Sequence, residues 1–308
     1  MQVKTINKVV SSKLNEWLET IIDLKLREDV KKNLLVSGGC ITSMFLNDTV
    51  NDFDIYIKDI NVLLKLANYY VPNRVLDGRL REQYLREYFA EFEDTDRNID
   101  QMMSSLDDNQ SEMVVRYKNL KPDQVKLNIS SFGERFKLDE SDEKYRVVFL
   151  SQNAISLTDD VQIVLRFSGT AEEIHKNFDF IHATNYFTFE DGLVTNIKAL
   201  ESTLTKELKY QGSLYPLTSI IRMKKFLLRG WKIHAGEILK IMFQISELNL
   251  RNPEVLEEQL IGVDIAYFSK IIEILRGAPE EKINSKYLNT IIDKVFNEFE
   301  EEDEQIKK

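Results

Sequence analysis

The sequence is short of cysteine and histidine: Cys40 stands alone, and three histidines are scattered among 308 residues. A single cysteine cannot form an internal disulfide, and this set cannot assemble a Cys/His zinc site. The chain also lacks a basic-then-apolar leader and any apolar run long enough to cross a bilayer. We therefore expect a protein of the reducing cytoplasm, without a membrane partner and without a structural metal.

Positive charge is in deficit as well. The formal net charge of -10 argues against a protein that coats nucleic acid, because binding of that kind rests on many Lys and Arg contacts to phosphate. A local basic patch remains compatible with this balance. What the chain does have, 43% hydrophobic and 30% charged residues, suffices for two domains with separate cores.

The order of apolar and turn-forming segments predicts an α+β protein. Apolar residues at helical spacing open the chain and predict an amphipathic helix, with Ser11 or Ser12 as its N-cap. The next segments predict, in order, a strand at 33–37, a turn at Gly38-Gly39, a helix at 41–48, a strand at 52–57 and a helix at 61–71.

Branched and aromatic residues dominate five later runs, which predict strands at 113–117, 125–130, 145–150, 154–157 and 161–167. Thr170 and Glu173 form a capping-box pattern, and helical periodicity dominates beyond Leu193. We predict three parts: an N-terminal helix packed on the next domain at 1–33, a sheet domain at 34–187 with an insert at about 72–145, and a helical domain with an acidic tail at 188–308.

Asp52 and Asp54 carry the chemistry that this pattern predicts. Residues i and i+2 of a strand point to the same face, so the two carboxylates lie side by side and repel each other unless a cation sits between them. Paired carboxylates plus substrate phosphates are the usual ligands of Mg²⁺, and the backbone at Gly38 and Gly39 can approach phosphate closely. The pattern favours a site for Mg²⁺ and a nucleoside triphosphate over a hairpin with solvated aspartates.

The segment SGGCITSMFLNDTVNDFDIYI resembles the signature of the DNA polymerase β nucleotidyltransferase superfamily. Three later segments resemble the branch of poly(A) polymerases and CCA-adding tRNA nucleotidyltransferases: FDFIHATNYFTFEDG, ALESTLTKELKYQG and PLTSIIRMKKFLLRGWKI. The resemblance implies a nucleotidyltransferase palm, which is a mixed sheet with flanking helices, followed by an all-α neck and body domain.

The resemblance also implies roles for individual residues. Asp52 and Asp54 would bind two Mg²⁺ ions. Asp179 would be a third catalytic carboxylate and metal ligand on a neighbouring strand, or it would match the nucleotide-binding Asp of the CCA-adding branch. A structural salt bridge is the remaining alternative for Asp179. The residues implied to contact the nucleotide or an RNA backbone are Gly38, Gly39, Tyr215, Arg222, Lys225 and Arg229. A solvated basic face is the alternative for the cationic members of this set.

Two departures from the family pattern concern substrate recognition. Thr42, Ser43 and Met44 stand where the family has a phosphate-contacting arginine. The base-reading element of CCA-adding enzymes, Glu-Asp-Pro-Leu-Arg, is replaced by residues 214–218, LYPLT. Because Tyr215 can stack and Thr218 offers one hydroxyl, we expect a base to be bound by stacking, with a purine preferred and ATP favoured as donor.

Together these patterns predict a Mg²⁺-dependent, template-independent nucleotidyltransferase. It would add a nucleoside monophosphate from an NTP to an acceptor hydroxyl, and the resemblance makes an RNA 3′ end the expected acceptor. Two alternatives stay open: a catalytically inactive binding or structural protein that keeps the fold, and nucleotidyl transfer to a protein or a small molecule.

Overall fold

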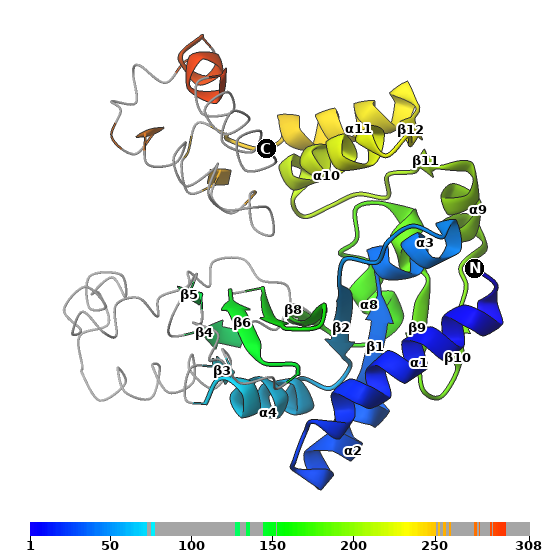
Figure 1. Ribbon diagram of the computed structural model, residues 1–308. Helices are drawn as coiled ribbons and strands as arrows, with labels where there is room; N and C mark the ends of the chain where they lie inside the picture. Colours follow the sequence, from blue (N-terminus) through cyan, green and yellow to red (C-terminus); the bar gives the residue numbers. More distant parts are fainter. Residues whose placement is uncertain are drawn as a thin grey trace, which may run out of the picture. The chain divides into compact units, whose positions relative to one another are not determined.

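The computed structural model describes residues 1–72, 75–77, 127–129, 134–135, 144–151 and 153–250, together with 252, 255–256, 259, 274–275, 277, 284 and 286–293. The strand expected at 113–117, most of the predicted insert and the acidic tail lie outside the described residues. The chain divides into two units (Figure 1). Unit 1 comprises Met1–Phe178 and His182–Thr205, and unit 2 comprises Asp179–Ile181 and Lys206–Lys308.

Within the described residues, the centre of unit 1 is an eight-stranded mixed sheet (Figure 1). Its strands, in spatial order, are β10 (Gly192–Val194), β9 (Tyr186–Thr188), β1 (Leu34–Ser37), β2 (Phe53–Ile57), β8 (Val161–Ser168), β7 (Ala154–Leu157), β6 (Val147–Leu150) and β5 (Glu134–Arg135). All neighbouring pairs are antiparallel except β2 and β8, which run parallel. β3 (Val75–Asp77) and β4 (Leu127–Ile129) pair separately.

Helices cover both faces of the sheet in unit 1. They are α1 (Val3–Glu19), α2 (Leu24–Asn33), α3 (Gly39–Leu46), α4 (Ile60–Tyr70), α8 (Ala171–His175), the 3₁₀ helix η1 (Ile181–Thr184) and α9 (Ile197–Thr205). The larger core joins α1, α2 and α4 to one face, to which β2 contributes Ile55 and Ile57. On the other face, Leu35 and Tyr56 pack with α8 in a smaller cluster. The alternation of strand side chains thus assigns Asp54 to the face that α8 covers.

Two predictions for the N-terminal segment are wrong. Residues 1–33 form two helices, because Asp23 starts a new one by accepting hydrogen bonds from the N–H groups of Lys25 and Leu26, at 2.9 and 3.0 Å. Ser11 and Ser12 lie inside α1, since its buried face starts earlier, at Ile6, and outweighs the capping tendency of serine. By contrast, the capping box of Thr170 and Glu173 at α8 is confirmed.

Unit 2 is helical in its described part. It contains α10 (Pro216–Leu228) and α11 (Ala235–Ser246), and two short strands, β11 (Glu207–Leu208) and β12 (Lys232–Ile233), pair in parallel. Pro216 begins α10 at a position where a missing N–H costs nothing. The predicted fold class, a mixed sheet with flanking helices followed by a helical part, is therefore confirmed. In the described ranges, no helix combines the length and apolar character needed to cross a membrane.

Candidate functional site

A glycine turn joins β1 to α3 and lies against the Asp54 carboxylate. Gly38 has a φ of 102°, which an L side chain rarely adopts, and its N–H donates to the Ala183 carbonyl at 3.0 Å. A Cβ on Gly38 would lie 3.1 Å from Asp54 Oδ2, whereas a Cβ on Gly39 would meet nothing within 4 Å. The turn therefore contacts one predicted metal ligand and leaves open space at the N-terminus of α3.

The two carboxylates lie at the start of β2. Asp54 is half-buried, and Asp52, one residue before the strand, is exposed. Burial, followed by the negative charges of Asp54 and Asp52, raises the pKa of the Cys40 thiol. Both carboxylates therefore lie near enough to the turn to act on the same buried group. Cys40 is 2% exposed and stays protonated, as expected of a small residue packed beneath the turn.

Hydrogen bonds from buried side chains fix the turn in place. Ser37 Oγ lies 3.0 Å from the Ala183 and Asn185 carbonyls and 2.8 Å from His175 Nε2. Carbonyls only accept, so the hydroxyl proton goes to them, and the His175 ring donates from Nε2 to Oγ. Thr42 Oγ1 adds a bond to the His182 carbonyl at 3.0 Å. Sequence reasoning missed this clamp, whose only local signal is a serine at the end of an apolar strand.

His175 should make the stability of the protein fall in acid. Burial lowers its pKa from 6.5 to about 4, so the unfolded chain takes up a proton more readily than the folded one. The contribution of His175 to the free energy of unfolding is therefore fully retained above about pH 6.5. As the pH falls towards 4, the free energy of unfolding decreases by about 2 kcal/mol. In urea unfolding at pH 7 and pH 4.5, His175→Gln should show a smaller acid loss than the wild type. Equal losses would contradict the assignment.

Asp179 does not lie on a strand, contrary to the sequence prediction. It occupies a bend in unit 2 and is 6% exposed. Its Oδ2 accepts a hydrogen bond from Arg222 Nη1 at 2.9 Å, and its Oδ1 accepts one from the Phe180 N–H at 3.0 Å. The structure thus contains the salt bridge that the sequence left as the alternative. The pair anchors Arg222, whose side chain remains 43% exposed, to a buried carboxylate.

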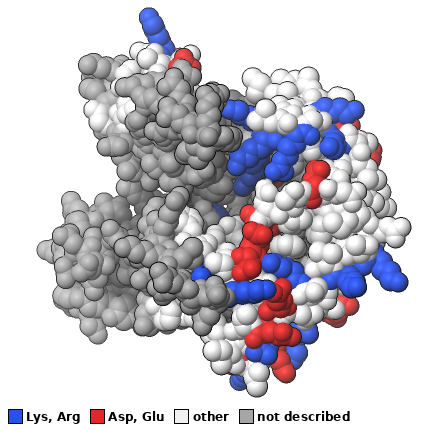
Figure 2. Space-filling view, in the orientation of Figure 1, with Lys and Arg blue, Asp and Glu red and all other residues white. Residues whose placement is uncertain are grey.

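Arg222, Lys225 and Arg229 recur three and four residues apart and so share one side of α10 and its C-cap. Lys225 and Arg229 are exposed and make no side-chain hydrogen bond or ion pair with the described part of the chain. Figure 2 shows Lys and Arg side chains gathered over the region of α10. This is a local cationic patch on a protein that is acidic as a whole.

The hydroxyl of Thr218, at the position of the family's base-reading arginine, is not accessible to a base. Thr218 is fully buried, and its hydroxyl donates to the Gln259 carbonyl at 2.7 Å. The same glutamine side chain donates to the Leu214 carbonyl at 3.0 Å. The hydroxyl therefore serves the packing of α10, which leaves Tyr215, at the N-cap of that helix, as the residue of this segment with a ring that can stack.

The predicted site residues fall into two groups, one in each unit. Gly38, Gly39, Asp52 and Asp54 come together in unit 1. Asp179, Tyr215, Arg222, Lys225 and Arg229 belong to unit 2. In the described part of the chain, no three His, Cys, Asp or Glu side chains converge as a metal cluster.

The described chain is an α+β protein in which strand, glycine turn, helix and carboxylate-bearing strand are arranged as the nucleotidyltransferase resemblance predicts. A family model described as "Gabija anti-defense 2 family protein" matches residues 8–206, which is more than half of the chain. The protein belongs to the Gabija anti-defense 2 family.

A curated relative, Gabija anti-defense 2 of Bacillus phage SPbetaL7, is 24% identical over 143 residues. The match covers 46% of this chain and 34% of the relative, so it spans about a third of the relative's length.

Similar solved structures include CCA-adding enzymes. The Thermotoga maritima CCA-adding enzyme complexed with tRNA_CCA is 12% identical, with a TM-score of 0.38, and the match covers 85% of this chain and 54% of that enzyme. A CCA-adding enzyme with CTP is 13% identical, also with a TM-score of 0.38, over 86% of this chain and 53% of the enzyme. The chain spans about half the length of these enzymes, and likenesses at this level decide nothing about what it binds.

Proposed function

We propose that this protein is a metal-dependent nucleotidyltransferase that uses an NTP as donor. The contact between the glycine turn and Asp54 carries the proposal. The close approach at Gly38 and the open space at Gly39 bring the start of α3, where backbone N–H groups point outwards, next to a carboxylate pair. A triphosphate needs both parts: donors for its oxygens, and an anionic site that holds its counter-ion.

Asp52 and Asp54 fit the ligand set of Mg²⁺, which is commonly held by one or two carboxylates and completed by substrate oxygens and water. When bound, the metal would stabilise in-line displacement at the α-phosphate, with pyrophosphate leaving. The strand geometry assigns the chain's own residues their parts. Asp54 is held against the turn, and Asp52, which is exposed, can adjust to the incoming substrate.

Arg222, Lys225 and Arg229 would bind phosphates of the triphosphate or of an RNA acceptor. These three side chains are the cationic members of the predicted site residues, because Thr42, Ser43 and Met44 of α3 are all uncharged. In this proposal Asp179 orients the Arg222 guanidinium rather than binding metal, since both of its oxygens already accept hydrogen bonds. Tyr215 would stack on the base, with ATP favoured as donor.

The test is incubation of the purified protein with Mg²⁺, total RNA and each labelled NTP in turn, with products resolved by length. We expect extended RNA and released pyrophosphate, with ATP used best and discrimination weak. Ordered use of CTP and then ATP would contradict the stacking model. Pyrophosphate release without extended RNA would point to a protein or small-molecule acceptor. If none of the acceptors tried gives pyrophosphate release, nucleotidyl transfer is contradicted.

Family membership supports a second proposal, that the protein counteracts the Gabija defence. The family description and the name of the phage relative carry it. The test is expression of the protein in a Gabija-carrying bacterium that is then infected with a phage that Gabija restricts. We expect more plaques than with an empty vector. An unchanged plaque count, with the protein present at normal levels, would contradict this role.

A further inference from the structure

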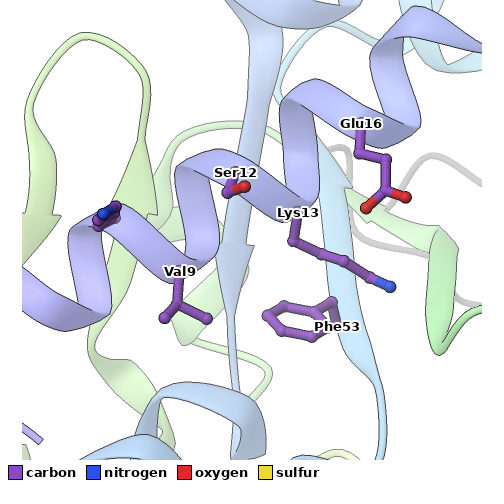
Figure 3. Close-up of a pocket in the computed structure, with 6 residues that line it drawn as sticks. Val9, Ser12, Lys13, Glu16 and Phe53 are labelled. Atoms are coloured by element: carbon purple, nitrogen blue, oxygen red, sulfur yellow. The ribbon is translucent and has the colours of Figure 1, made fainter.

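Phe53 fixes which way the Asp54 carboxylate faces. The Phe53 ring lies on the α1 side of the sheet, where it lines a surface hollow with Val9 and Lys13 (Figure 3). Successive residues of a strand point to opposite faces, so the Asp54 side chain points away from α1. A side chain that completes a site with Asp54 has to project from that same face of the sheet.

A row of polar side chains crosses this face at the level of Asp54. Gln162 of β8 is the register partner of Asp54 in the parallel β2–β8 pair. It is also the register partner of Ser156 in the antiparallel pair of β7 and β8. Residues paired in this way point to the same face of a sheet. The neighbours of Gln162 along β8, Val161 and Ile163, are buried in the larger core on the other face, as this alternation requires.

Ser156 orients the side-chain amide of Gln162. Gln162 Nε2 donates a hydrogen bond to Ser156 Oγ at 3.1 Å. Because the nitrogen and the oxygen of an amide diverge from one carbon, this bond turns Gln162 Oε1 away from β7. Within the described residues, Oε1 accepts no hydrogen bond, and the side chain is half-buried rather than enclosed. The amide oxygen is therefore held in place and can still bind a ligand.

Gln162 and the glycine turn lie on opposite sides of Asp54. β2 stands between β1 and β8 in the sheet, so the turn that follows β1 contacts Asp54 from one side and Gln162 is next to it on the other. Side-chain carbonyl oxygens suit the same hard cations as carboxylates do. An amide is neutral, so it can add a ligand atom without adding to the repulsion between the two aspartates.

We propose that Gln162 is a neutral third protein ligand of the metal site, with Oε1 as its ligand atom. This inference rests on the proposed function, because it takes Asp52 and Asp54 as the other ligands. Ser156 is a positioning residue, which acts by holding the amide with its oxygen free. Two carboxylates and one amide leave more of the cation's charge for the phosphate oxygens of the NTP than three carboxylates would.

The test is titration of the full chain with Mn²⁺ in the absence of nucleotide, with free Mn²⁺ measured by electron paramagnetic resonance. Mn²⁺ suits the same oxygen ligands as Mg²⁺. The Mn²⁺ that Asp54→Asn no longer binds defines the site. At this site, Gln162→Leu should weaken binding about tenfold, as expected for a lost metal contact. Gln162→Glu should bind at least as tightly as the wild type, because it keeps an oxygen ligand and adds a charge.

Variants of the serine separate positioning from structure. Ser156→Ala should weaken Mn²⁺ binding by less than Gln162→Leu does, since the amide can then turn its nitrogen towards the metal. Ser156→Thr, which keeps the hydroxyl, should restore binding. Gln2→Leu makes the glutamine substitution at the exposed N-cap of α1 and should change nothing. Urea unfolding of the same preparations shows that each variant is folded.

The inference and the proposed function can fail separately. Unchanged Mn²⁺ binding in Gln162→Leu, while Asp54→Asn loses it, would overturn the role of Gln162 and leave a site of two carboxylates. The absence of any Mn²⁺ binding that depends on Asp54 would overturn the metal site and the inference together. Mn²⁺ binding that follows the expected order, without pyrophosphate release from any NTP, would support Gln162 as a ligand and contradict nucleotidyl transfer.

Discussion

Asp54→Asn should reduce nucleotidyl transfer about 10³-fold or more while the protein stays folded. The substitution keeps the shape of the side chain and removes the charge that a Mg²⁺ ligand needs, a loss worth several kcal/mol of transition-state stabilisation. Asp54 is the carboxylate that the glycine turn contacts, and so it should have the larger effect of the pair. Asp52→Asn should also lower the rate of nucleotidyl transfer, because the Asp52 carboxylate completes the anionic pair. Pyrophosphate release from labelled NTP measures both.

The matched control is Asp48→Asn, which removes the same charge from an exposed position just after α3. We expect its rate to stay within about twofold of the wild type. Urea unfolding of all three variants shows whether a lost rate reflects a lost fold. Transfer that persists in the Asp52→Asn, Asp54→Asn double variant would refute the assignment of the metal site to β2.

The same double variant tests whether the proposed action against the Gabija defence requires nucleotidyl transfer or only binding by the folded protein. If the action against Gabija depends on nucleotidyl transfer, the variant should lose the plaque increase that the wild type gives. A variant that keeps the full increase would favour the alternative raised from the sequence, in which the fold serves as a binding protein. The two proposals can thus fail separately, because the plaque assay and the pyrophosphate assay have different readouts.

Local patterns predicted the part of the candidate site that is local in sequence. The β1–α3–β2 segment follows from alternation of apolar residues, a glycine pair and a second alternating run, and the observed strands begin and end within a residue or so of the predicted bounds. The placement of Asp54 beside the turn follows from the same pattern. This placement does not depend on contacts between residues that are distant in sequence, because only about 20 residues separate the start of β1 from Asp54.

Contacts between distant residues could not be predicted in this way. The Asp179–Arg222 pair joins residues 43 positions apart, and the bond from Thr218 to Gln259 spans 41. In each case a polar side chain that looked available in the sequence is taken up by a partner that no local pattern identifies. The hydrogen bond between Ser37 and His175, 138 residues apart, is hidden for the same reason. Burial costs a polar group free energy unless it finds such a partner.

Substitutions of the two glycines should have opposite consequences, because one supports the fold and the other faces open space. Gly38→Ala should lower the free energy of unfolding by about 1–3 kcal/mol, since a Cβ at a φ of 102° is strained and would press on Asp54 Oδ2 at 3.1 Å. Gly39→Ala should leave stability unchanged or raise it by about 0.5 kcal/mol, because its Cβ meets nothing within 4 Å.

Gly39→Val should then show what the open space is for. If phosphate oxygens approach the backbone there, the branched side chain should occupy their position and raise the KM for NTP about 100-fold, a penalty of nearly 3 kcal/mol in binding. Stability should stay close to that of Gly39→Ala, so that loss of fold cannot explain the effect. Initial rates over a range of ATP concentrations, with urea unfolding of the same preparations, measure both quantities. An unchanged KM in Gly39→Val, with transfer still abolished by Asp54→Asn, would place the triphosphate away from the start of α3.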